Sequence, residues 1–510
     1  MIVRRFAPAA TAVATLLGST AVAEVTASQV WEEMKAQIDI YGEGVTIGNE
    51  DVSGGTVTIS DIVVDVSDDY DAIMVTVPQI VFAEQGDGTV AITLSDDIPF
   101  SFDSSRYDWE NDTFEPTTYE GAVRHSGLSM IVSGTPDKMT YDYSADRYAV
   151  ELDGATYKGA PFDVAGLFAM NDLTGTYVLT PGEVRSMSYD ITAGGLDISF
   201  SADDPEAGID FTFSGQIADL AVAAAVQFQE AILESGYDGE GFDPSTLLAD
   251  ISYTFGNLAY VFDFAEDGME ADGQMTADGG AFTFTFDTDE VVYDAATQNV
   301  ALDMTTNAVP FPVNATLAEY GLSLRAPLSV TDEPAPFDFA FNVTEFAVND
   351  EVWQMGDPGG MFPREPLTVE LALSGTATWL YDIFDMSPEN QMALNDSDMP
   401  LQPDSISIDT LNLDALGVTA TGDGAFTFDA TDTVTVPGVP RPEGQANVEV
   451  TGLNALLDDL VAMGLVPEDQ MMGARMMMGL FATSTGDDRL TSNVEINAQG
   501  HVIVNGQRIQ

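Results

Sequence analysis

Apolar residues alternate with polar or small residues along most of this chain. The pattern is plainest in residues 282–286, where three phenylalanines share one face and two threonines the other. A period of two is typical of a half-buried β-strand. Similar runs, separated by Gly-Gly, Asp-Asp or Gly-Asp-Gly turns, recur from Val57 to Val504, and such turns favour antiparallel hairpins. The sequence therefore predicts a mainly β fold, a meander of long curved antiparallel sheets with a few covering helices.

Helical spacing of apolar residues interrupts the alternation in several places. The predicted helices are Ser28–Ile40, Ile217–Leu233, Trp379–Met386, Leu453–Met463 and Pro467–Phe481. The last two form a predicted helical hairpin over residues 453–481. Within the strands, the alternation changes phase across Asp61, which predicts a β-bulge.

A short sequence echo and a proline-rich segment suggest how the chain is divided. Gly280–Phe284 recurs as Gly424–Phe428, which indicates two related β lobes, although reuse of a common hairpin sequence explains it equally well. Five prolines lie in residues 310–336. We therefore predict a signal peptide at 1–23, an N-terminal β-rich lobe at 24–309, a Pro-rich junction at 310–336 and a C-terminal β-rich lobe at 337–510.

The first 23 residues have the features of a secretory signal peptide. Arg4-Arg5 gives a basic start, an apolar stretch follows to Leu17, and Ala21-Val22-Ala23 is a small-residue cleavage motif. The apolar stretch is too short for a membrane anchor. We expect a periplasmic location, with secretion as the alternative, and no integral membrane segment after cleavage.

The charge balance limits the partners. The chain has 84 acidic and 15 basic residues, with a formal net charge of -69. Such a surface repels nucleic acid, so no nucleic-acid partner is expected. The 45% hydrophobic content indicates a folded chain. Cysteine is absent, which excludes disulfides and thiolate sites. We interpret the acid excess mainly as a solubility feature.

No catalytic or cofactor-binding constellation stands out. His125 and His501 are the two histidines, and neither lies beside a hydrolase or zinc motif. Calcium is the metal for which the sequence offers candidates, because acidic clusters at 67–71, 237–243 and 287–290 carry oxygen ligands in turns. None of them follows a calcium-loop pattern, and solvated turn carboxylates are the alternative interpretation.

The most locally specified stretch runs from Trp353 to Leu373. Its prolines fix φ and Gly359-Gly360 permits a sharp turn, so we expect a rigid loop without helix before Leu367, followed by a strand. Arg364, set between prolines, is predicted to clasp a carboxylate or carbonyl oxygen. The candidate site residues, with a structural or a recognition role, are Trp353, Asp357, Pro358, Pro363, Arg364 and Pro366.

With this loop pattern ahead of a strand, the chain resembles an exported Gram-negative protein family, domain of unknown function 2125. The resemblance extends over most of the chain after Ala23 and is sharpest in the loop. It implies an envelope location and a β-rich fold. It supplies no catalytic residue, because the family has no assigned function.

These observations favour a non-enzymatic periplasmic protein that binds an apolar or lipid component of the envelope, or supports envelope assembly, on the concave face of a curved sheet. The phenylalanine-rich faces and the methionines of residues 471–478 predict an open apolar groove, with sheet-on-sheet packing as the competing arrangement. Two alternatives stay open: an outer-membrane β-barrel, disfavoured by the helices and the acidic outer faces, and an enzyme of unrecognised class.

Cleavage after Ala23 is the first testable prediction. N-terminal sequencing of the protein purified from the periplasm should begin at Glu24, because the small residues at 21 and 23 fit the signal peptidase. Recovery of intact Met1 in an envelope fraction, or fractionation with the cytoplasm, would contradict it.

Overall fold

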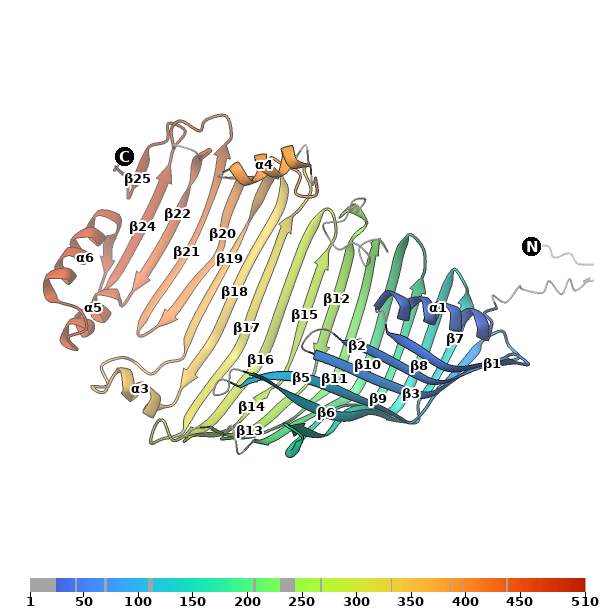
Figure 1. Cartoon of the computed structure of the whole chain (residues 1–510). Coiled ribbons are helices and arrows are strands. Elements are labelled where there is room, and N and C mark those ends of the chain that lie inside the picture. The colour runs from blue at the N-terminus through green and yellow to red at the C-terminus, as the bar shows by residue number, and fades with distance from the viewer. Residues whose placement is uncertain are drawn as a thin grey trace, which may run out of the picture.

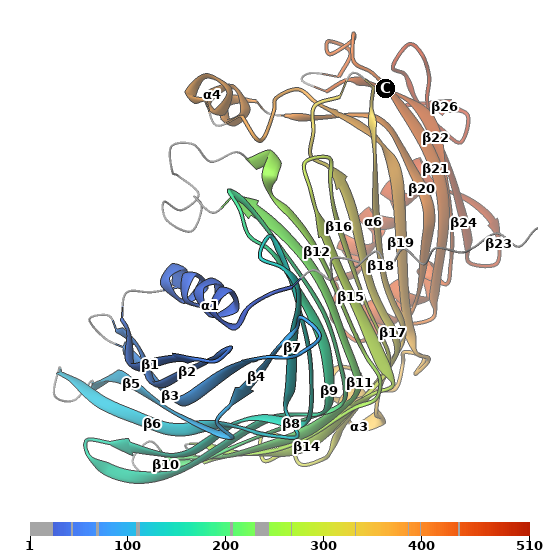
Figure 2. The same ribbon diagram turned by 90° about the vertical axis from the view of Figure 1, so that its right-hand side faces the viewer.

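The computed structural model describes residues 24–41, 44–67, 71–108, 113–204, 208–229, 244–266, 268–331, 333–385, 387–397, 399–436 and 439–509. Within these residues the strands join into one 26-stranded antiparallel sheet. The sheet curls, so that one of its faces is concave (Figure 1, Figure 2). The predicted mainly β fold is confirmed.

The strands follow one another along the chain, and most hairpin partners are neighbours in sequence. The N-terminal strands are β1 (Val45–Ser53), β2 (Thr56–Ser67), β3 (Asp71–Glu84), β4 (Val90–Leu94), β5 (Asp97–Asp108), β6 (Thr113–Ser126), β7 (Ser129–Thr135), β8 (Lys138–Tyr157), β9 (Ala160–Thr180), β10 (Val184–Asp204) and β11 (Ile209–Gln229). The central strands are β12 (Leu248–Phe255), β13 (Leu258–Glu266), β14 (Met269–Ala277), β15 (Gly279–Phe286), β16 (Glu290–Thr306), β17 (Val313–Pro327), β18 (Ala335–Val348) and β19 (Leu367–Trp379). The last strands are β20 (Leu401–Ala415), β21 (Val418–Asp429), β22 (Arg441–Thr451), β23 (Thr483–Gly486), β24 (Arg489–Ile496), β25 (Val502–Val504) and β26 (Gln507–Arg508).

Apart from α1, the helices lie at the margins of the sheet. In the described part of the chain they are α1 (Ala27–Tyr41), α3 (Asp350–Gly356), α4 (Pro388–Asp396), α5 (Leu453–Ala462) and α6 (Glu468–Phe481), with a 3-10 turn η1 (Pro244–Thr246). Helix α1 lies on the concave side, whereas α3 and α4 lie at opposite ends of the strands (Figure 1, Figure 2). The predicted helical hairpin is confirmed as α5 and α6.

The main buried core lies at the N-terminal end of the sheet, where the sheet curls around α1. Val30 and Trp31 of the helix are fully covered, and the Trp31 ring lies 5.8 Å from the ring of Phe82 in β3. Apolar residues of β2, β4, β7 and β8 complete this cluster. Helix α1 therefore packs on the concave face here and covers the apolar residues that a second sheet would cover in a β-sandwich.

Residues with positive φ inside long strands contribute to the curvature. Asp61, Asp172, Asp219, Asn299 and Glu345 all have φ between 49° and 54° and interrupt the pairing in β2, β9, β11, β16 and β18. Asp and Asn tolerate this conformation better than most residues. At Glu345 the register against β19 also slips, which forms a bulge, and a bulge bends a strand. The bulge predicted at Asp61 is wrong, since β2 keeps the same register against β1 and β3 on both sides of this residue. The positive φ of Asp61 is what accompanies the change of phase there.

The helix predicted from Ile217 is wrong in its described part, since residues 217–229 continue β11; residues 230–233 lie outside the described residues. The error has a physical cause. The positive φ of Asp219 changes the phase of the alternation without a slip in the register against β10. Ile217 and Leu220 therefore reach the same face although they are three positions apart. Three positions is also the spacing of neighbours on a helix.

Two further predictions about helices are wrong. Residues 353–356, expected to be extended, form the end of α3. Residues 379–386 were expected to be helical and stopped by Ser387-Pro388, yet the helix α4 begins at Pro388. The Ser387 hydroxyl accepts a hydrogen bond from the backbone N–H of Asn390, and proline suits the first helical position because it lacks an N–H.

The Pro-rich segment 310–336 does not interrupt the sheet. Within it, β17 pairs along its length with β16 on one side and with β18 on the other. Pro327 ends β17, and its carbonyl accepts a hydrogen bond from the indole of Trp379 at 2.7 Å. The two predicted lobes are thus joined by continuous hydrogen-bonded strands, and the boundary between them stays a prediction.

Candidate functional site

The concave face carries continuous rows of apolar side chains. In an antiparallel sheet, residues paired across strands point to the same face, so the pairing defines each row. One row runs from β8 to β25 through Tyr141, Tyr177, Tyr189, Ala224, Ile251, Phe284, Tyr293, Leu324, Phe339, Leu373, Ile408, Gly424, Ala446, Val494 and Val504. No charged residue occurs in it.

A second row of the same kind lies beside the first. It runs through Tyr143, Gly175, Ile191, Val222, Tyr253, Phe282, Ala295, Leu322, Phe341, Leu371, Leu411, Gly422 and Val448, and ends at Ser492 in β24. Tyr141 packs with α1 in the buried core, which identifies the face that bears these rows as the concave one. The two rows together form a broad apolar band across the sheet.

The intervening residues form the opposite face and are polar or small. The corresponding row consists of Asp142, Thr176, Asp190, Ala223, Ser252, Thr283, Asp294, Ser323, Ala340, Ala372 and Thr410. Hydrogen bonds such as that from the Thr176 hydroxyl to Asp142, at 2.8 Å, link neighbouring strands on this side. The sheet is therefore strongly amphipathic.

The apolar band stays partly open over the C-terminal half of the sheet. Both buried clusters of the described residues are built from segments that precede β14. Farther along, Phe282, Leu322, Phe339 and Phe341 are half-buried, and Leu324 is 40% exposed. A contiguous exposed apolar surface is unfavourable in water and commonly marks a binding site. Sheet-on-sheet packing, the arrangement that competes with the predicted groove, is not what the described strands form, since they belong to a single sheet.

Tyrosines line the band next to α1. The rings of Tyr177 and Tyr189 stack at 4.7 Å, and that of Tyr141 lies 5.4 Å from Tyr177. Burial, with a further contribution from Glu33, raises the pKa of Tyr141 to about 12, and burial also raises the pKa of Tyr177. These phenols stay protonated at neutral pH, so they present uncharged rings to the concave face.

An ion pair fastens α1 above these tyrosines. Glu33 of the helix and Arg185 of β10 lie 3.3 Å apart, with side chains only 14% and 6% exposed. A buried charge requires a partner of opposite charge, because removal from water is costly. The pair therefore holds the middle of α1 against β10.

The loop around Asp357 is held by its own hydrogen bonds. The Asp357 side chain is 1% exposed, and its two oxygens accept the backbone N–H groups of Met361 and Phe362, both at 2.9 Å. Burial by itself raises the pKa of Asp357, but these two N–H groups and the Arg364 guanidinium outweigh it and hold the pKa below the ordinary value of an aspartate.

Arg364 binds the same aspartate from the other side of the turn. Its Nη2 lies 3.2 Å from both a carboxylate oxygen and the carbonyl oxygen of Asp357. Its guanidinium also stacks over the Trp353 ring at 5.1 Å. The carboxylate and carbonyl oxygens of Asp357 are the two kinds of acceptor that the sequence predicts for Arg364. Trp353, Asp357 and Arg364 are thus brought together.

The prolines of the loop have different surroundings. Pro358, Pro363 and Pro366 are exposed. Pro363 packs against the turn between β20 and β21, where a Cβ atom on Gly417 would lie 3.0 Å from its ring. The loop therefore rests on the neighbouring hairpin, and its recognition role stays a prediction.

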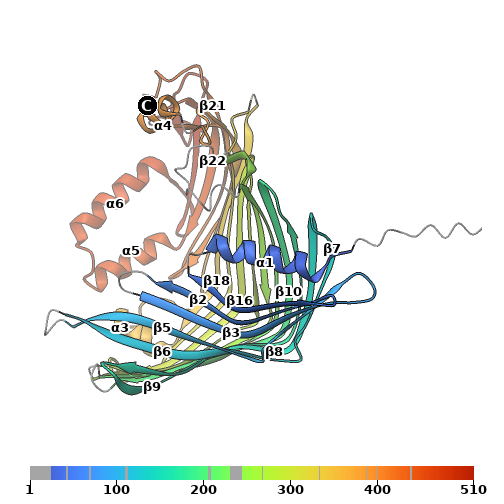
Figure 3. The same cartoon turned by 45° about the vertical axis from the view of Figure 1, so that its right-hand side comes forward.

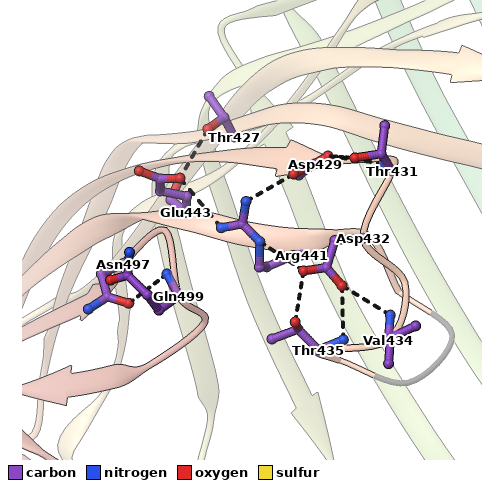
Figure 4. A network of polar contacts seen from close by, with 10 residues as sticks. All are labelled: Thr427, Asp429, Thr431, Asp432, Val434, Thr435, Arg441, Glu443, Asn497 and Gln499. Carbon is purple, nitrogen blue, oxygen red and sulfur yellow. Dashed lines mark hydrogen bonds and ion pairs between the residues drawn. The ribbon is translucent and has the colours of Figure 1, made fainter.

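A second polar network ties the loop between β21 and β22 (Figure 4). Arg441 contacts Asp429 at 2.9 Å, Asp432 at 3.2 Å and Glu443 at 3.5 Å. Hydrogen bonds from Thr431 lower the pKa of Asp429, and those from Thr435 lower the pKa of Asp432. The guanidinium occupies the place among these carboxylates that a cation would need, and the sequence pattern gave no sign of the network.

The calcium candidates find no support in the described residues. Asp287 accepts the backbone N–H groups of Asp289 and Glu290 in a turn. Residues 68–70 and 237–243, which carry the other two clusters, lie outside the described residues. Across the part of the chain that the structure describes, no group of three or more acidic or histidine side chains is placed to hold a metal.

Comparison with known proteins identifies a family for the C-terminal half. Residues 261–507 match the family model DUF2125, uncharacterized protein conserved in bacteria. This part of the chain is similar to that family. The resemblance predicted from the loop is confirmed, although the match begins within β13 and is shorter than expected. No curated protein and no solved structure matches the chain.

The DUF2125 region extends from β13 into β26 and so contains the open half of the apolar band, the Asp357 loop and the α5–α6 hairpin. None of the helices in the described residues has the length and hydrophobicity that a membrane crossing requires.

Replacement of Arg364 tests the clasp. We expect Arg364→Ala to lower the free energy of unfolding by about 1 to 3 kcal/mol, because the bonds to Asp357 and the stacking on Trp353 are lost. Arg364→Lys should recover little, since lysine lacks the planar fork. Urea denaturation measures both variants.

A matched control is Arg325→Ala, which removes an exposed ion pair to Glu290 and should cost less than about 1 kcal/mol. An Arg364→Ala midpoint equal to that of the wild type would mean that the arginine is free for recognition.

The lowered pKa of Asp357 predicts a pH dependence. The charged carboxylate stabilises the fold above the unfolded pKa of about 3.9, and this contribution is lost as the pH falls through the lower folded value. Asp357→Asn should therefore be less stable than the wild type at pH 7, and the gap should close toward pH ~2. Denaturation at several pH values checks this, with Asp350→Asn, an exposed residue of α3, as control. A gap that is independent of pH would contradict it.

Proposed function

We propose that this is a non-enzymatic periplasmic protein that binds the acyl chain of an envelope lipid along its concave face. The observation that carries the proposal is the apolar band, which continues across the sheet but is covered by α1 only at its N-terminal end. An extended hydrocarbon chain matches a long uncharged band better than a compact polar ligand does, because every row offers the same apolar contacts.

The chemistry of the band supports an apolar ligand. Its side chains are aromatic and aliphatic, and at Gly422 and Gly424 the neighbouring residues pack closely against the glycine backbone. Burial of each CH₂ group of a ligand contributes about 0.8 kcal/mol. A chain of several such groups therefore has enough binding energy to offset the entropy lost on binding.

The location is supported by the sequence alone. Export is predicted by Arg4-Arg5, the apolar stretch and the Ala21-Val22-Ala23 motif. A protein exported to the envelope is surrounded by membranes that can supply a lipid ligand. The negative surface disfavours anionic partners outside the band.

The direct test is native mass spectrometry of the protein purified from its own periplasm. We expect a lipid that co-purifies and that is released by organic solvent. Protein recovered free of lipid, together with no binding of an acyl-chain probe, would overturn the proposal and favour support of envelope assembly without a bound lipid.

Paired substitutions on the two faces sharpen the test. Leu322 and Phe341 pair on the concave face, and Ser323 and Ala340 pair on the opposite face of the same two strands. L322D/F341D should weaken binding of a fluorescent acyl probe with an uncharged headgroup at least about tenfold, because carboxylates then face the chain. S323D/A340D adds the same charge and should leave binding unchanged. Equal effects of the two double variants would contradict a site on the concave face.

A further inference from the structure

Helix α6 presents an uncovered apolar surface. Met472, Met476 and Leu480, spaced four apart on one side of the helix, are 69%, 73% and 61% exposed. Met477 and Phe481 widen this surface, at 55% and 44% exposed. Met471 is the helix's only buried residue. We call these five exposed residues, 472, 476, 477, 480 and 481, the methionine face.

The methionine face carries no free charge. Arg475 is the one charged residue between Gln470 and Phe481, and its guanidinium turns toward α5, where it donates to Asp458 at 2.6 Å and to the carbonyl of Asn454 at 3.3 Å. Residues 470–486 include no acidic residue, although the full chain has 84 of them. From Gln470 onward the helix is therefore a local exception to the repulsive negative surface, whereas its first turn carries Glu468 and Asp469.

The helical hairpin is attached at the C-terminal end of the apolar band. Ser492 ends the second apolar row, and its hydroxyl donates to the carbonyl of Phe481, the last residue of α6. Figure 3 shows α5 and α6 projecting beside the last large strands, at the end of the sheet away from α1. The end of α6, with Phe481 of the methionine face, thus lies next to the end of the second apolar row.

We propose that the methionine face of α6 inserts into the surface of a lipid bilayer and brings the open end of the band to the membrane. This inference rests on the proposed function, since it identifies where an acyl chain would enter. A helix with one apolar side, whose two acidic residues are confined to the first turn, can lie in the plane of a bilayer, with its apolar side chains among the acyl chains. Methionine is flexible and adapts to a fluid surface.

The charge of the whole chain specifies the kind of bilayer. A formal charge of -69 repels anionic headgroups within about 8 Å at physiological ionic strength. Binding should therefore be stronger to zwitterionic phosphatidylcholine vesicles than to vesicles that contain phosphatidylglycerol, and salt should reduce the difference.

Vesicle flotation with the purified mature protein tests the proposal. We expect the wild type to float with phosphatidylcholine vesicles and M472Q/M476Q/M477Q to bind at least about tenfold more weakly, because three apolar contacts are lost. The matched control, M269Q/M355Q/M392Q, replaces three methionines elsewhere that are 50%, 65% and 64% exposed, and it should float like the wild type.

The two proposals fail in different ways. If the concave face binds lipid as proposed, the α6 variant keeps the affinity for the soluble acyl probe, and L322D/F341D loses that affinity but still floats. Wild-type protein that stays with the unbound fraction, or equal flotation of the α6 variant and the control, would overturn the role of α6 alone. A change in oligomeric state of the α6 variant on size exclusion, without a change in flotation, would identify the methionine face as a protein interface instead.

Discussion

The cross-strand hydrogen-bond register is the constraint on which this structure depends. A shift of one residue in any pair would turn the apolar side chains of that strand to the opposite face. Over the C-terminal half of the sheet no second layer is present among the described residues to correct such a shift. The register alone therefore keeps residues such as Phe284, Leu324 and Phe339 in one row. The apolar band exists because every pairing from β8 to β25 agrees on which face is apolar.

Hydrophobic burial is distributed unevenly along the sheet. At the N-terminal end, α1 places Val30 and Trp31 against the band, and the buried ion pair of Glu33 with Arg185 fixes the helix there. At the other end the same kind of surface remains half-exposed. The chain thus stabilises one end with its own helix and leaves the remaining band accessible. This asymmetry connects the fold with the proposed lipid binding, because a ligand can lower the free energy only where the surface is still in contact with water.

The few basic residues act as clasps within an acidic chain. Arg364 binds the two oxygen types of Asp357, and Arg441 contacts three carboxylates. Arg124 likewise bridges Asp97, Glu151 and Asp153 on neighbouring strands. A guanidinium with several donors relieves the repulsion among acids that the fold brings together. Most of the negative charge can then stay on the surface, while loops and strand ends keep fixed positions.

The sequence by itself determined which segments are strands and which face of each is apolar, because the period of two in stretches such as 282–286 depends only on local backbone geometry. It also determined the helical hairpin and the acceptors of Arg364. The positive φ of Asp219 gave the apolar residues of β11 a helical spacing, so local periodicity failed there. Only the tertiary structure decided the register between strands, the position of α1 on the sheet and which half of the apolar band stays open. Those features depend on partners far apart in sequence, such as Glu33 and Arg185 at a separation of 152 residues, and a local pattern of apolar residues contains no information about which distant segment will pair with it.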